Sequence, residues 1–230
     1  KVKSIIDIRE KSNGSLPKKC DELGIKIHWK SAVIYTEGYK KINKIHVINL
    51  SKDNSSVVGN KLKIDCDLLC VSGGYTPAVH LYTQSGGKLD YNEDKHYFFP
   101  KKNTLNQMSI GSCNGTFGLK NIITESHEKT KEFLDIKKTE QFSILEPKSG
   151  NFENIWLIPS NKIFGKTKSF VDYQNDSTAN DIKLALREGF KSIEHVKRYT
   201  TTGMATDQGK IANMHALGIV SEITNTKLGE

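Results

Sequence analysis

The feature that most constrains the fold is the stretch of residues 171–212, in which local signals define two short helices. Thr178 followed by Asp181 has a spacing like that of a capping box, in which a hydroxyl and a carboxylate satisfy the first free amides of a helix. Apolar residues then recur at helical spacing as far as Gly189, which can adopt the left-handed conformation of a helix end. The same pattern starts again at Ser192. We therefore predict a compact helical hairpin with a polar turn at each end.

This stretch resembles the helical domain of the alpha subunit of heterotetrameric sarcosine oxidase. The similarity is carried by four uninterrupted blocks: FVDYQND at 170–176, ALREGF at 185–190, EHVKRYT at 194–200 and GMATDQGK at 203–210. Blocks of this length are specific. The resemblance implies that the chain is an internal piece of that subunit.

The stretch is also similar to small ferredoxin-type helical domains, which place Cys-x-Cys before the first helix and two further cysteines after the second. On that pattern the four cysteine positions are occupied by Asp172, Gln174, Asp207 and Ala212. Iron–sulfur clusters are held chiefly by thiolates, and none of these side chains can donate sulfur. We therefore expect residues 171–212 to keep the helical arrangement of these domains, here called the frame, without a cluster or other metal. We also expect Asp207 to accept hydrogen bonds from turn amides and Gln174 to lie near the first helix cap.

Upstream, strand-like and helix-like segments alternate. Apolar residues between 2 and 8 predict a strand that ends in Asp7 and Arg9, and Pro17 begins a helix that stops at Gly24. In dinucleotide-binding folds an acidic residue at such a strand end binds ribose, and a nearby arginine suits a phosphate. The glycine-rich turn that should precede the strand is missing, which favours the alternative that Asp7 is simply a strand-end residue.

A second group of candidate cofactor contacts follows an apolar run. Alternation between residues 25 and 50 predicts a small antiparallel sheet, whereas the run 64–71 predicts a return to a buried parallel strand. Gly73 and Gly74 come next. Such strand ends line the ligand crevice of an open sheet, and paired glycines let the backbone approach a cofactor or a neighbouring turn. Of these two possibilities we assign both glycines to cofactor binding.

A third group lies in residues 108–118, which predict a strand leading into a helix from about Thr116 to Phe133. Comparable strands in two-dinucleotide oxidoreductases end in Gly-Asp, but here Ser112 follows Gly111, which argues against a conventional FAD site. Free amides at a helix start still suit a pyrophosphate, and the sarcosine oxidase resemblance implies NAD in this place. The predicted wall consists of Gly111, Ser112, Cys113, Thr116 and Phe117.

The composition argues against several other functions. Although the net charge is +8, lysines alternate with acidic residues, and no aromatic-basic pattern marks a nucleic-acid surface. No apolar run reaches membrane-spanning length. Four cysteines without disulfide-framework spacing fit a reducing cytoplasm. Cys113 lies near a predicted helix start, where the pKa of a thiol can be lowered, so a redox-active thiol is an alternative role. The lack of a Cys or His adjacent in sequence argues against that role.

Together these segments predict an α/β protein in three parts. Residues 1–135 form a partial Rossmann-like dinucleotide-binding region of the two-dinucleotide oxidoreductase type, 136–152 a linker, and 153–230 the small helical domain. The resemblance implies oxidation of sarcosine by oxygen and water to glycine, hydrogen peroxide and either formaldehyde or methylene-tetrahydrofolate. It also implies FMN and FAD in the full complex, beta, gamma and delta subunits as partners, and tetrahydrofolate in a C-terminal region absent here.

Within that complex we expect NAD binding and assembly roles, because the chain offers no convincing acid–base pair and hence no catalytic residue. One alternative is the large subunit of a related amino- or imino-acid dehydrogenase, and another is a non-catalytic assembly module. Such dehydrogenases tend to keep a cluster or a conventional flavin motif. The missing cysteines and the missing Asp after Gly111 therefore favour the oxidase.

The cluster-free frame makes a chemical prediction. The intact complex, purified anaerobically, should contain no iron or acid-labile sulfide assignable to residues 171–212, because none of the four cysteine-equivalent positions carries a thiol. The nearest cysteine in sequence, Cys113, cannot by itself replace four thiolates. Iron and sulfide assays and a spectrum after reduction test this. Stoichiometric iron that is lost on mutating Asp172 or Asp207 would contradict it.

Overall fold

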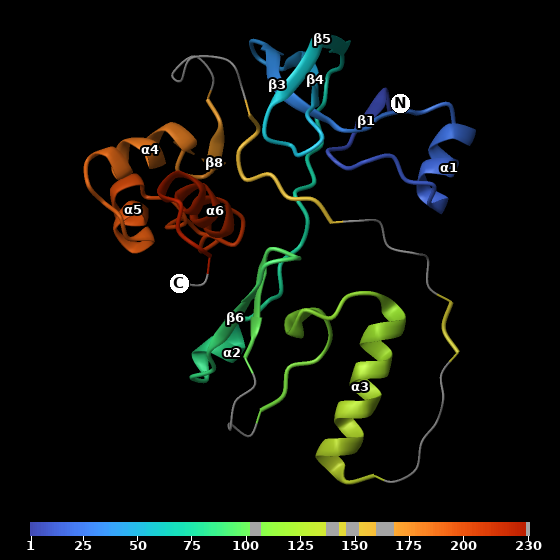
Figure 1. Ribbon diagram of the computed structural model, residues 1–230, viewed down its shortest axis with the longest axis vertical. Coiled ribbons are helices and arrows are strands. Elements are labelled where there is room, and N and C mark those ends of the chain that lie inside the picture. Colours follow the sequence, from blue (N-terminus) through green and yellow to red (C-terminus); the bar gives the residue numbers. More distant parts are fainter. Residues whose placement is uncertain (102–106, 137–142, 146–151, 160–167, 229–230) are drawn as a thin grey trace. The chain divides into compact units, whose positions relative to one another are not determined.

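The computed structural model describes residues 1–101, 107–136, 143–145, 152–159 and 168–228, and its architecture is mixed α/β (Figure 1). Contacts divide the chain into two units, essentially Lys1–Cys70 with Asn151–Leu228 and, separately, Val71–Gly150. This grouping differs from the predicted division at residues 135 and 153, because residues 1–70 pack with the chain after residue 151.

The first unit begins with a small parallel β-α-β segment. Its elements are β1 (Ser4–Ile6), α1 (Ser15–Glu22) and β2 (Lys26–His28). Gly24, just after α1, has φ +64°, the left-handed conformation expected at this helix end. The predicted first strand and helix are confirmed, although the strand is shorter than its apolar pattern.

A three-stranded antiparallel sheet follows, in the order β3 (Ser31–Gly38), β4 (Ile42–Leu50) and β5 (Val57–Asp65). The central strand β4 has a neighbouring strand on each side, and its residues Ile45, Val47 and Ile48 are buried. The predicted antiparallel sheet is therefore confirmed for residues 31–50, and β5 extends it. Residues 26–28 of the predicted segment pair in parallel with β1 instead.

The predicted buried parallel strand at residues 64–71 is wrong. Ile64 and Asp65 end β5 and pair antiparallel with β4. Beyond them the chain leaves the sheet, and Leu68 and Val71 are 72% and 76% exposed. Periodicity does not identify the strand with which a short apolar run pairs. Here the first residues of the run, Ile64 and Asp65, pair with β4.

The second unit contains α2 (His80–Gln84), the hairpin of β6 (Leu89–Asn92) and β7 (Tyr97–Pro100), the 3-10 helix η1 (Gly111–Asn114), and α3 (Leu119–Leu134). Residues 107–110 form neither helix nor strand, so the strand predicted before Gly111 is wrong for these described residues. The predicted helix is confirmed, but it begins at Leu119 because Gly118 before it has φ +92°.

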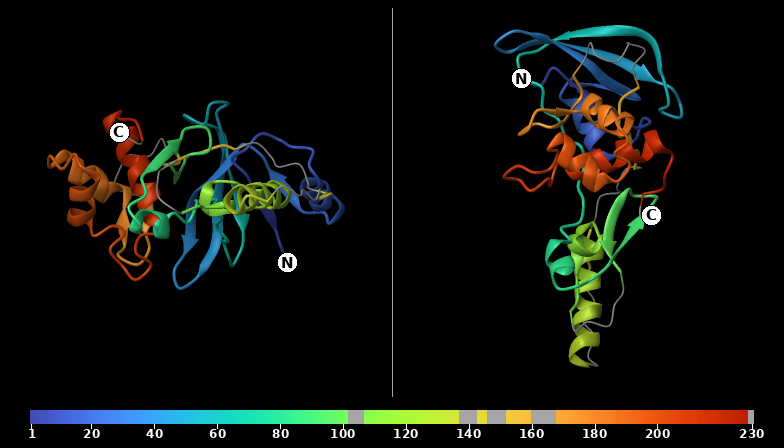
Figure 2. Two further views of the ribbon diagram at one scale, coloured as in Figure 1. Left: turned by 90° about the horizontal axis from the view of Figure 1, so that it is seen from below. Right: turned by 90° about the vertical axis from the view of Figure 1, so that its left-hand side faces the viewer.

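The helical part of the first unit confirms the predicted helix pair. It consists of the hairpin β8 (Phe170–Asp172) and β9 (Ser177–Thr178) with α4 (Ala179–Arg187), α5 (Ile193–Thr200) and α6 (Ala212–Thr224), and the three helices lie together in both views of Figure 2. Thr178 N donates to Asp181 Oδ2 at 2.8 Å and Asp181 N to Thr178 Oγ1 at 3.4 Å, so the capping box is complete. The helices enclose a core that includes Ile182, Ala185, Val196, Ala216 and Ile219.

The segment 152–158 connects the helices to residues 1–70. Trp156 packs on α6, where a Cβ on Gly218 would lie 2.1 Å from the indole, so glycine is required at this contact. Glu153 accepts hydrogen bonds from Lys30 Nζ at 2.8 Å and from Asn54 Nδ2 at 2.6 Å. These contacts explain why the two sequence segments form one unit.

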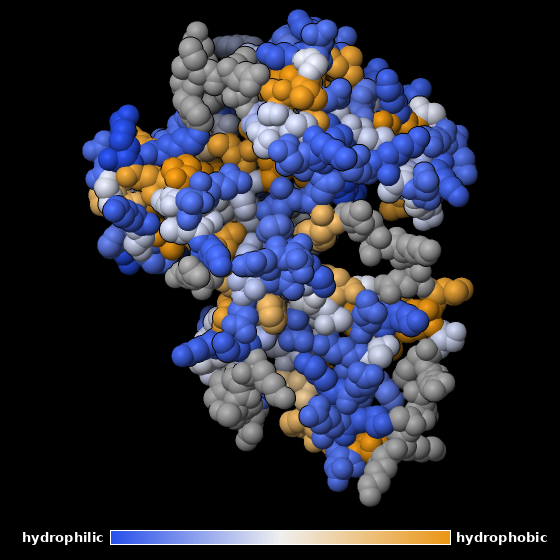
Figure 3. Space-filling model, viewed as in Figure 1, coloured by the Kyte–Doolittle hydropathy of each residue, from blue (hydrophilic) through white to orange (hydrophobic). Residues whose placement is uncertain are grey.

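The face shown in Figure 3 is mainly hydrophilic, with hydrophobic residues in separate patches.

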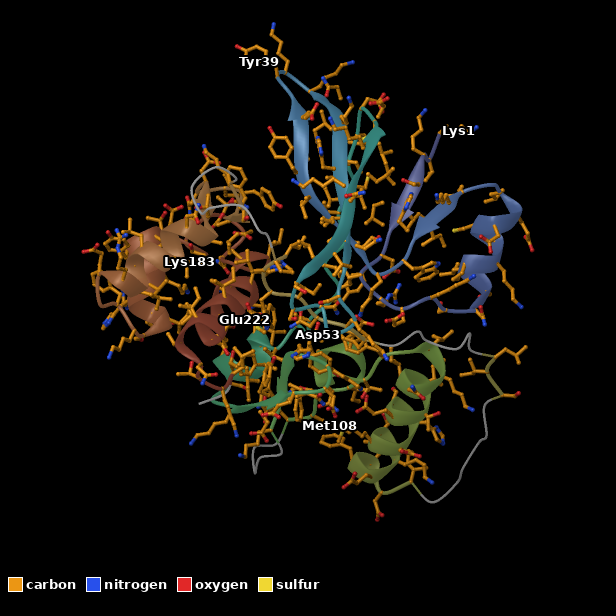
Figure 4. The ribbon with its side chains drawn as sticks, turned by 45° about the horizontal axis from the view of Figure 1, so that its top comes forward. Lys1, Tyr39, Asp53, Met108, Lys183 and Glu222 are labelled. Carbon is orange, nitrogen blue, oxygen red and sulfur yellow. The ribbon has the colours of Figure 1, made fainter. Side chains whose placement is uncertain are left out.

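Burial raises the pKa of Glu222 on α6, and the charge of Lys183 on α4 opposes that shift; Figure 4 labels both residues. Among the described residues, every helix is too short or too polar to cross a membrane.

The capping box should contribute measurably to stability. We expect Thr178→Ala to lower the free energy of unfolding by about 1 kcal/mol, because the N-terminal amides of α4 lose their acceptor. Chemical denaturation provides the measurement. Thr178→Ser keeps the hydroxyl and serves as the control. An equal loss in both variants would show that the methyl group, and not the cap, matters.

Candidate functional site

All five residues of the predicted cofactor wall lie in one turn of the second unit. Gly111 is buried with φ +73°, and Gly115 and Gly118 have φ +79° and +92°. Glycine adopts these values without the steric cost of a side chain, so the three glycines permit a tight bend between η1 and α3. Around this bend Ser112 and Phe117 are exposed, whereas Cys113 and Thr116 are half-buried.

The carboxylate of Glu125, on α3, contacts the turn from the side that faces the helix, which we call the inner side. Glu125 Oε2 accepts from Gly111 N at 2.7 Å, and Oε1 accepts from Asn114 Nδ2 at 2.6 Å. Lys129 Nζ lies 3.5 Å from Oε1 and donates to the carbonyl of Ser109 at 3.2 Å. Burial raises the pKa of Glu125, but the hydrogen bonds from the turn and the charge of Lys129 hold it below its ordinary value.

The hairpin β6–β7 supports the turn through Tyr97, which is 2% exposed. Its hydroxyl donates to the carbonyl of Gly115 at 2.7 Å, and its ring lies edge-on to Phe117 at 5.6 Å between centroids. A Cβ on Gly115 would lie 2.9 Å from the Tyr97 ring. Cys113 Sγ donates to the carbonyl of Ile110 at 3.0 Å. The turn is therefore fixed by contacts within its own unit.

Glu125, Asn114 and Lys129 are absent from the predicted site. Their importance arises from contacts with the turn 11 to 20 residues away in sequence. The one local signal is the spacing of Glu125 and Lys129, which places them on the same face of the predicted helix. That spacing also occurs in ordinary solvent-exposed ion pairs, so it does not identify a site.

On the outer side of the turn, opposite Glu125, the start of α3 has no side-chain partner among the described residues. Among the described residues, no side chain caps α3, and its first turn contains no acidic residue. The positive end of the helix dipole and its first amides are therefore uncompensated by side chains. The amide of Gly111 already donates a hydrogen bond to Glu125. Ser112, Phe117 and the start of α3 are the exposed groups on this side of the turn.

Asp7 and Arg9 lie in the first unit, directly after β1. Arg9 Nη2 donates to Asp7 Oδ2 at 2.7 Å, while its Nε and backbone N donate to Oδ1 at 3.0 and 2.9 Å. Burial raises the pKa of Asp7, but the hydrogen bonds and charge of Arg9 hold it below its ordinary value. Both carboxylate oxygens are engaged, which fits the strand-end interpretation, and ribose binding stays a prediction.

Gly73 and Gly74 lie in the second unit, in a stretch at residues 71–79 that contains neither helix nor strand. Both are exposed, and Gly74 has φ +96°. Because the run 64–71 is not a parallel strand, these glycines do not mark a strand end of a parallel sheet. Their contact with a cofactor stays a prediction.

Asp172, the first of the four cysteine-equivalent positions, is a buried carboxylate that joins two loops. It is 4% exposed. Its Oδ2 accepts from Gly203 N at 2.8 Å, and Oδ1 accepts from Gln174 N and Asn175 N at 2.9 and 3.1 Å. Burial raises the pKa of Asp172, but these amides hold it below its ordinary value. The carboxylate thus links the loop before α4 to the loop after α5.

The other three positions have different environments. Asp207 Oδ1 accepts from Gly209 N at 3.2 Å, which confirms its predicted contact with turn amides. Gln174 Oε1 accepts from Thr206 Oγ1 at 2.7 Å, so its observed partner is the second loop and not the first helix cap. Ala212 is buried at the start of α6. In the described parts of the chain, no three His, Cys, Asp or Glu side chains form a group able to hold a metal.

An open pocket of about 280 Å³ lies in the helical part, lined mainly by polar residues of the β8–β9 turn, α4 and α5. None of the predicted site residues lines it.

The amino-acid sequence matches known alpha subunits over most of its length. Residues 166–230 match the family model described as the sarcosine oxidase A3 domain. Sarcosine oxidase alpha subunits from Corynebacterium sp. strain P-1, Corynebacterium sp. strain U-96 and Rhizobium meliloti strain 1021 are 30%, 28% and 31% identical to it over 211, 229 and 203 residues. The predicted resemblance is confirmed.

The matched region is a part of those relatives. The alignments cover 87%, 96% and 84% of this chain but 21%, 24% and 19% of the three alpha subunits, so the chain spans about a fifth of their length. The crystal structure of L-proline dehydrogenase from P. horikoshii is similar with a TM-score of 0.62 and 19% identity, over 99% of this chain and 46% of that one. The two proteins share a fold over this region.

The Asp172 contacts predict a pH-dependent loss of stability on mutation. Asp172→Asn should lower the free energy of unfolding by about 1–3 kcal/mol at neutral pH, because one carboxylate oxygen becomes a donor that faces backbone amides. The lowered pKa means that the ionised carboxylate stabilises the fold above its unfolded pKa of about 4, and this contribution is lost as the pH falls through the folded pKa.

Thermal unfolding of wild type and variant between pH 7 and pH 2 measures both effects. The difference between them should shrink toward the acid end. Asp176→Asn, at an exposed position in the same turn, is the matched control. A pH-independent difference for Asp172→Asn would refute the ionic explanation.

Proposed function

We propose that this chain is part of the alpha subunit of a heterotetrameric sarcosine oxidase, an oxidoreductase complex that acts on CH–NH donors with oxygen as acceptor. The observation that carries the proposal is the match of three sarcosine oxidase alpha subunits to 84–96% of the chain. The complex would convert sarcosine, oxygen and water into glycine, formaldehyde and hydrogen peroxide. With tetrahydrofolate as one-carbon acceptor, methylene-tetrahydrofolate would replace formaldehyde.

Within this complex the chain would bind NAD and support assembly, and would not oxidise the amine. The carboxylates at the candidate sites support this role, because Glu125, Asp7 and Asp172 all have partners within the chain. FMN and FAD would belong to the full complex, with beta, gamma and delta subunits as partners. Tetrahydrofolate would bind the C-terminal region of the longer alpha subunit, and the complex would operate in the cytoplasm.

NAD would lie against the outer side of the 111–117 turn, where it would supply a nicotinamide ring able to exchange hydride. Ser112, Cys113, Thr116 and Phe117 would line this wall, and Gly111 would shape it. The exposed Ser112 and Phe117 and the uncapped start of α3 support the assignment. Further contacts are proposed for Asp7, Arg9, Gly73 and Gly74.

The finer fold assignments belong to the same proposal. The parallel pair β1 and β2 with α1 between them supports a partial Rossmann-like region of the two-dinucleotide oxidoreductase type. The helix pair between two linked polar loops supports a ferredoxin-type helical domain that lacks its cluster. In this view Asp172 maintains the frame through amide hydrogen bonds.

A second candidate is the large subunit of an amino- or imino-acid dehydrogenase. The similarity to L-proline dehydrogenase favours it, but at 19% identity that similarity concerns the fold. A non-catalytic assembly module is the third candidate. Peroxide formation with sarcosine, compared with dye reduction by proline, distinguishes the first two in the purified complex, and NAD retention excludes the third.

We expect Ser112→Glu to reduce the NAD content of the assembled enzyme by about tenfold or more, because a carboxylate beside the turn repels pyrophosphate. Mass spectrometry of the released ligand provides the measurement. Thr130→Glu adds the same charge at an exposed position later on α3 and should retain NAD. Full retention by Ser112→Glu would remove this wall from the site, and wild type without NAD would favour the assembly module.

A further inference from the structure

Glu125 contacts both ends of η1, the first part of the turn that carries the proposed dinucleotide wall. Its two oxygens have separate partners, Gly111 N at 2.7 Å and Asn114 Nδ2 at 2.6 Å. Lys129, on the same face of α3, lies 3.5 Å from Glu125 and donates to the carbonyl of Ser109 at 3.2 Å. This pair of side chains therefore fixes residues 109–114 to the helix that follows them.

The turn requires such a contact because its residues specify little conformation by themselves. Gly111, Gly115 and Gly118 all have positive φ, and glycine loses more conformational entropy on ordering than any other residue. Gly111 is also buried, and a buried amide without an acceptor is costly. Glu125 selects the observed turn from the many conformations open to a glycine-rich loop.

Glu125 acts through the turn and does not face the proposed ligand. Its side chain is 15% exposed and lies against Gly111, whereas Ser112 and Phe117 are exposed. Lys129 partly neutralises its charge, which reduces the repulsion of an anion on the outer side. A contact that orders a binding loop in advance lowers the ordering cost on ligand binding.

We infer that Glu125 is a positioning residue for dinucleotide binding, which preorganises the wall from Ser112 to Phe117 for the pyrophosphate of NAD. The inference rests on the proposed function, since it concerns the same turn. It assigns the role to the geometry of the two hydrogen bonds and not to the negative charge alone.

The test uses the full-length alpha subunit in its assembled complex. Glu125→Gln keeps the side-chain shape but provides one acceptor oxygen in place of two, Glu125→Asp keeps the charge but shortens the reach, and Glu128→Gln removes the same charge from an exposed position on α3. Two quantities are measured for each variant: the NAD dissociation constant, and the hydrogen exchange of amides 109–118 without added NAD. Flavin content and subunit stoichiometry report assembly.

We expect Glu125→Gln and Glu125→Asp to weaken NAD binding about tenfold, the effect of losing one charge-assisted hydrogen bond. Exchange at residues 109–118 should accelerate by a similar factor, while flavin content stays constant. Glu128→Gln should match wild type in both measurements. Glu125→Gln and Glu125→Asp change different properties of the side chain but both remove a hydrogen bond to the turn, so agreement between them identifies that pair of hydrogen bonds as the cause.

Wild-type NAD affinity in Glu125→Gln would overturn the inference while leaving the proposed NAD site in place. Unchanged exchange would overturn it as well, because the turn would then be ordered without Glu125. Equal weakening by Glu128→Gln would assign the effect to charge and also overturn it. Failure of wild type itself to bind NAD would instead refute the proposed function, and the inference with it.

Discussion

The helical part of this protein depends on the buried carboxylate of Asp172. Burying an ionised group is unfavourable unless hydrogen bonds replace its water, and here three backbone amides do so. Because one amide belongs to Gly203 and the others to residues 174–175, satisfying the charge also brings the two loops together. The helices that follow these loops can then enclose one apolar core, which includes Ile182 and Ile219.

The same physical device recurs in the second unit, where Glu125 closes the turn before α3. Charge-assisted hydrogen bonds to backbone amides are strong and directional, so a single carboxylate can order a segment rich in glycine. The device also affects function. The amide of Gly111 donates to Glu125 and is therefore not available to a phosphate. For this reason the proposed NAD contacts lie on the outer side of the turn, at Ser112 and Phe117.

These features fit a subunit segment that positions other groups. The carboxylates of Asp7, Glu125 and Asp172 have hydrogen-bond partners within the chain, and the exposed residues of the proposed wall are Ser112 and Phe117. The chain spans about a fifth of its sarcosine oxidase relatives. These observations support the proposal that oxidation is performed elsewhere in the complex.

The sequence by itself determined the helices whose signals lie within one or two helical turns: α1, which ends before Gly24, α4 with its capping box, and α5. It also determined the family resemblance. It also indicated the antiparallel sheet, since alternation is local. Only the tertiary structure decided that residues 64–65 pair with β4, that Glu125 meets Gly111, and that Asp172 meets Gly203. Those contacts join residues 14 to 31 positions apart, or depend on which neighbouring strand is available, and local spacing contains no information about either.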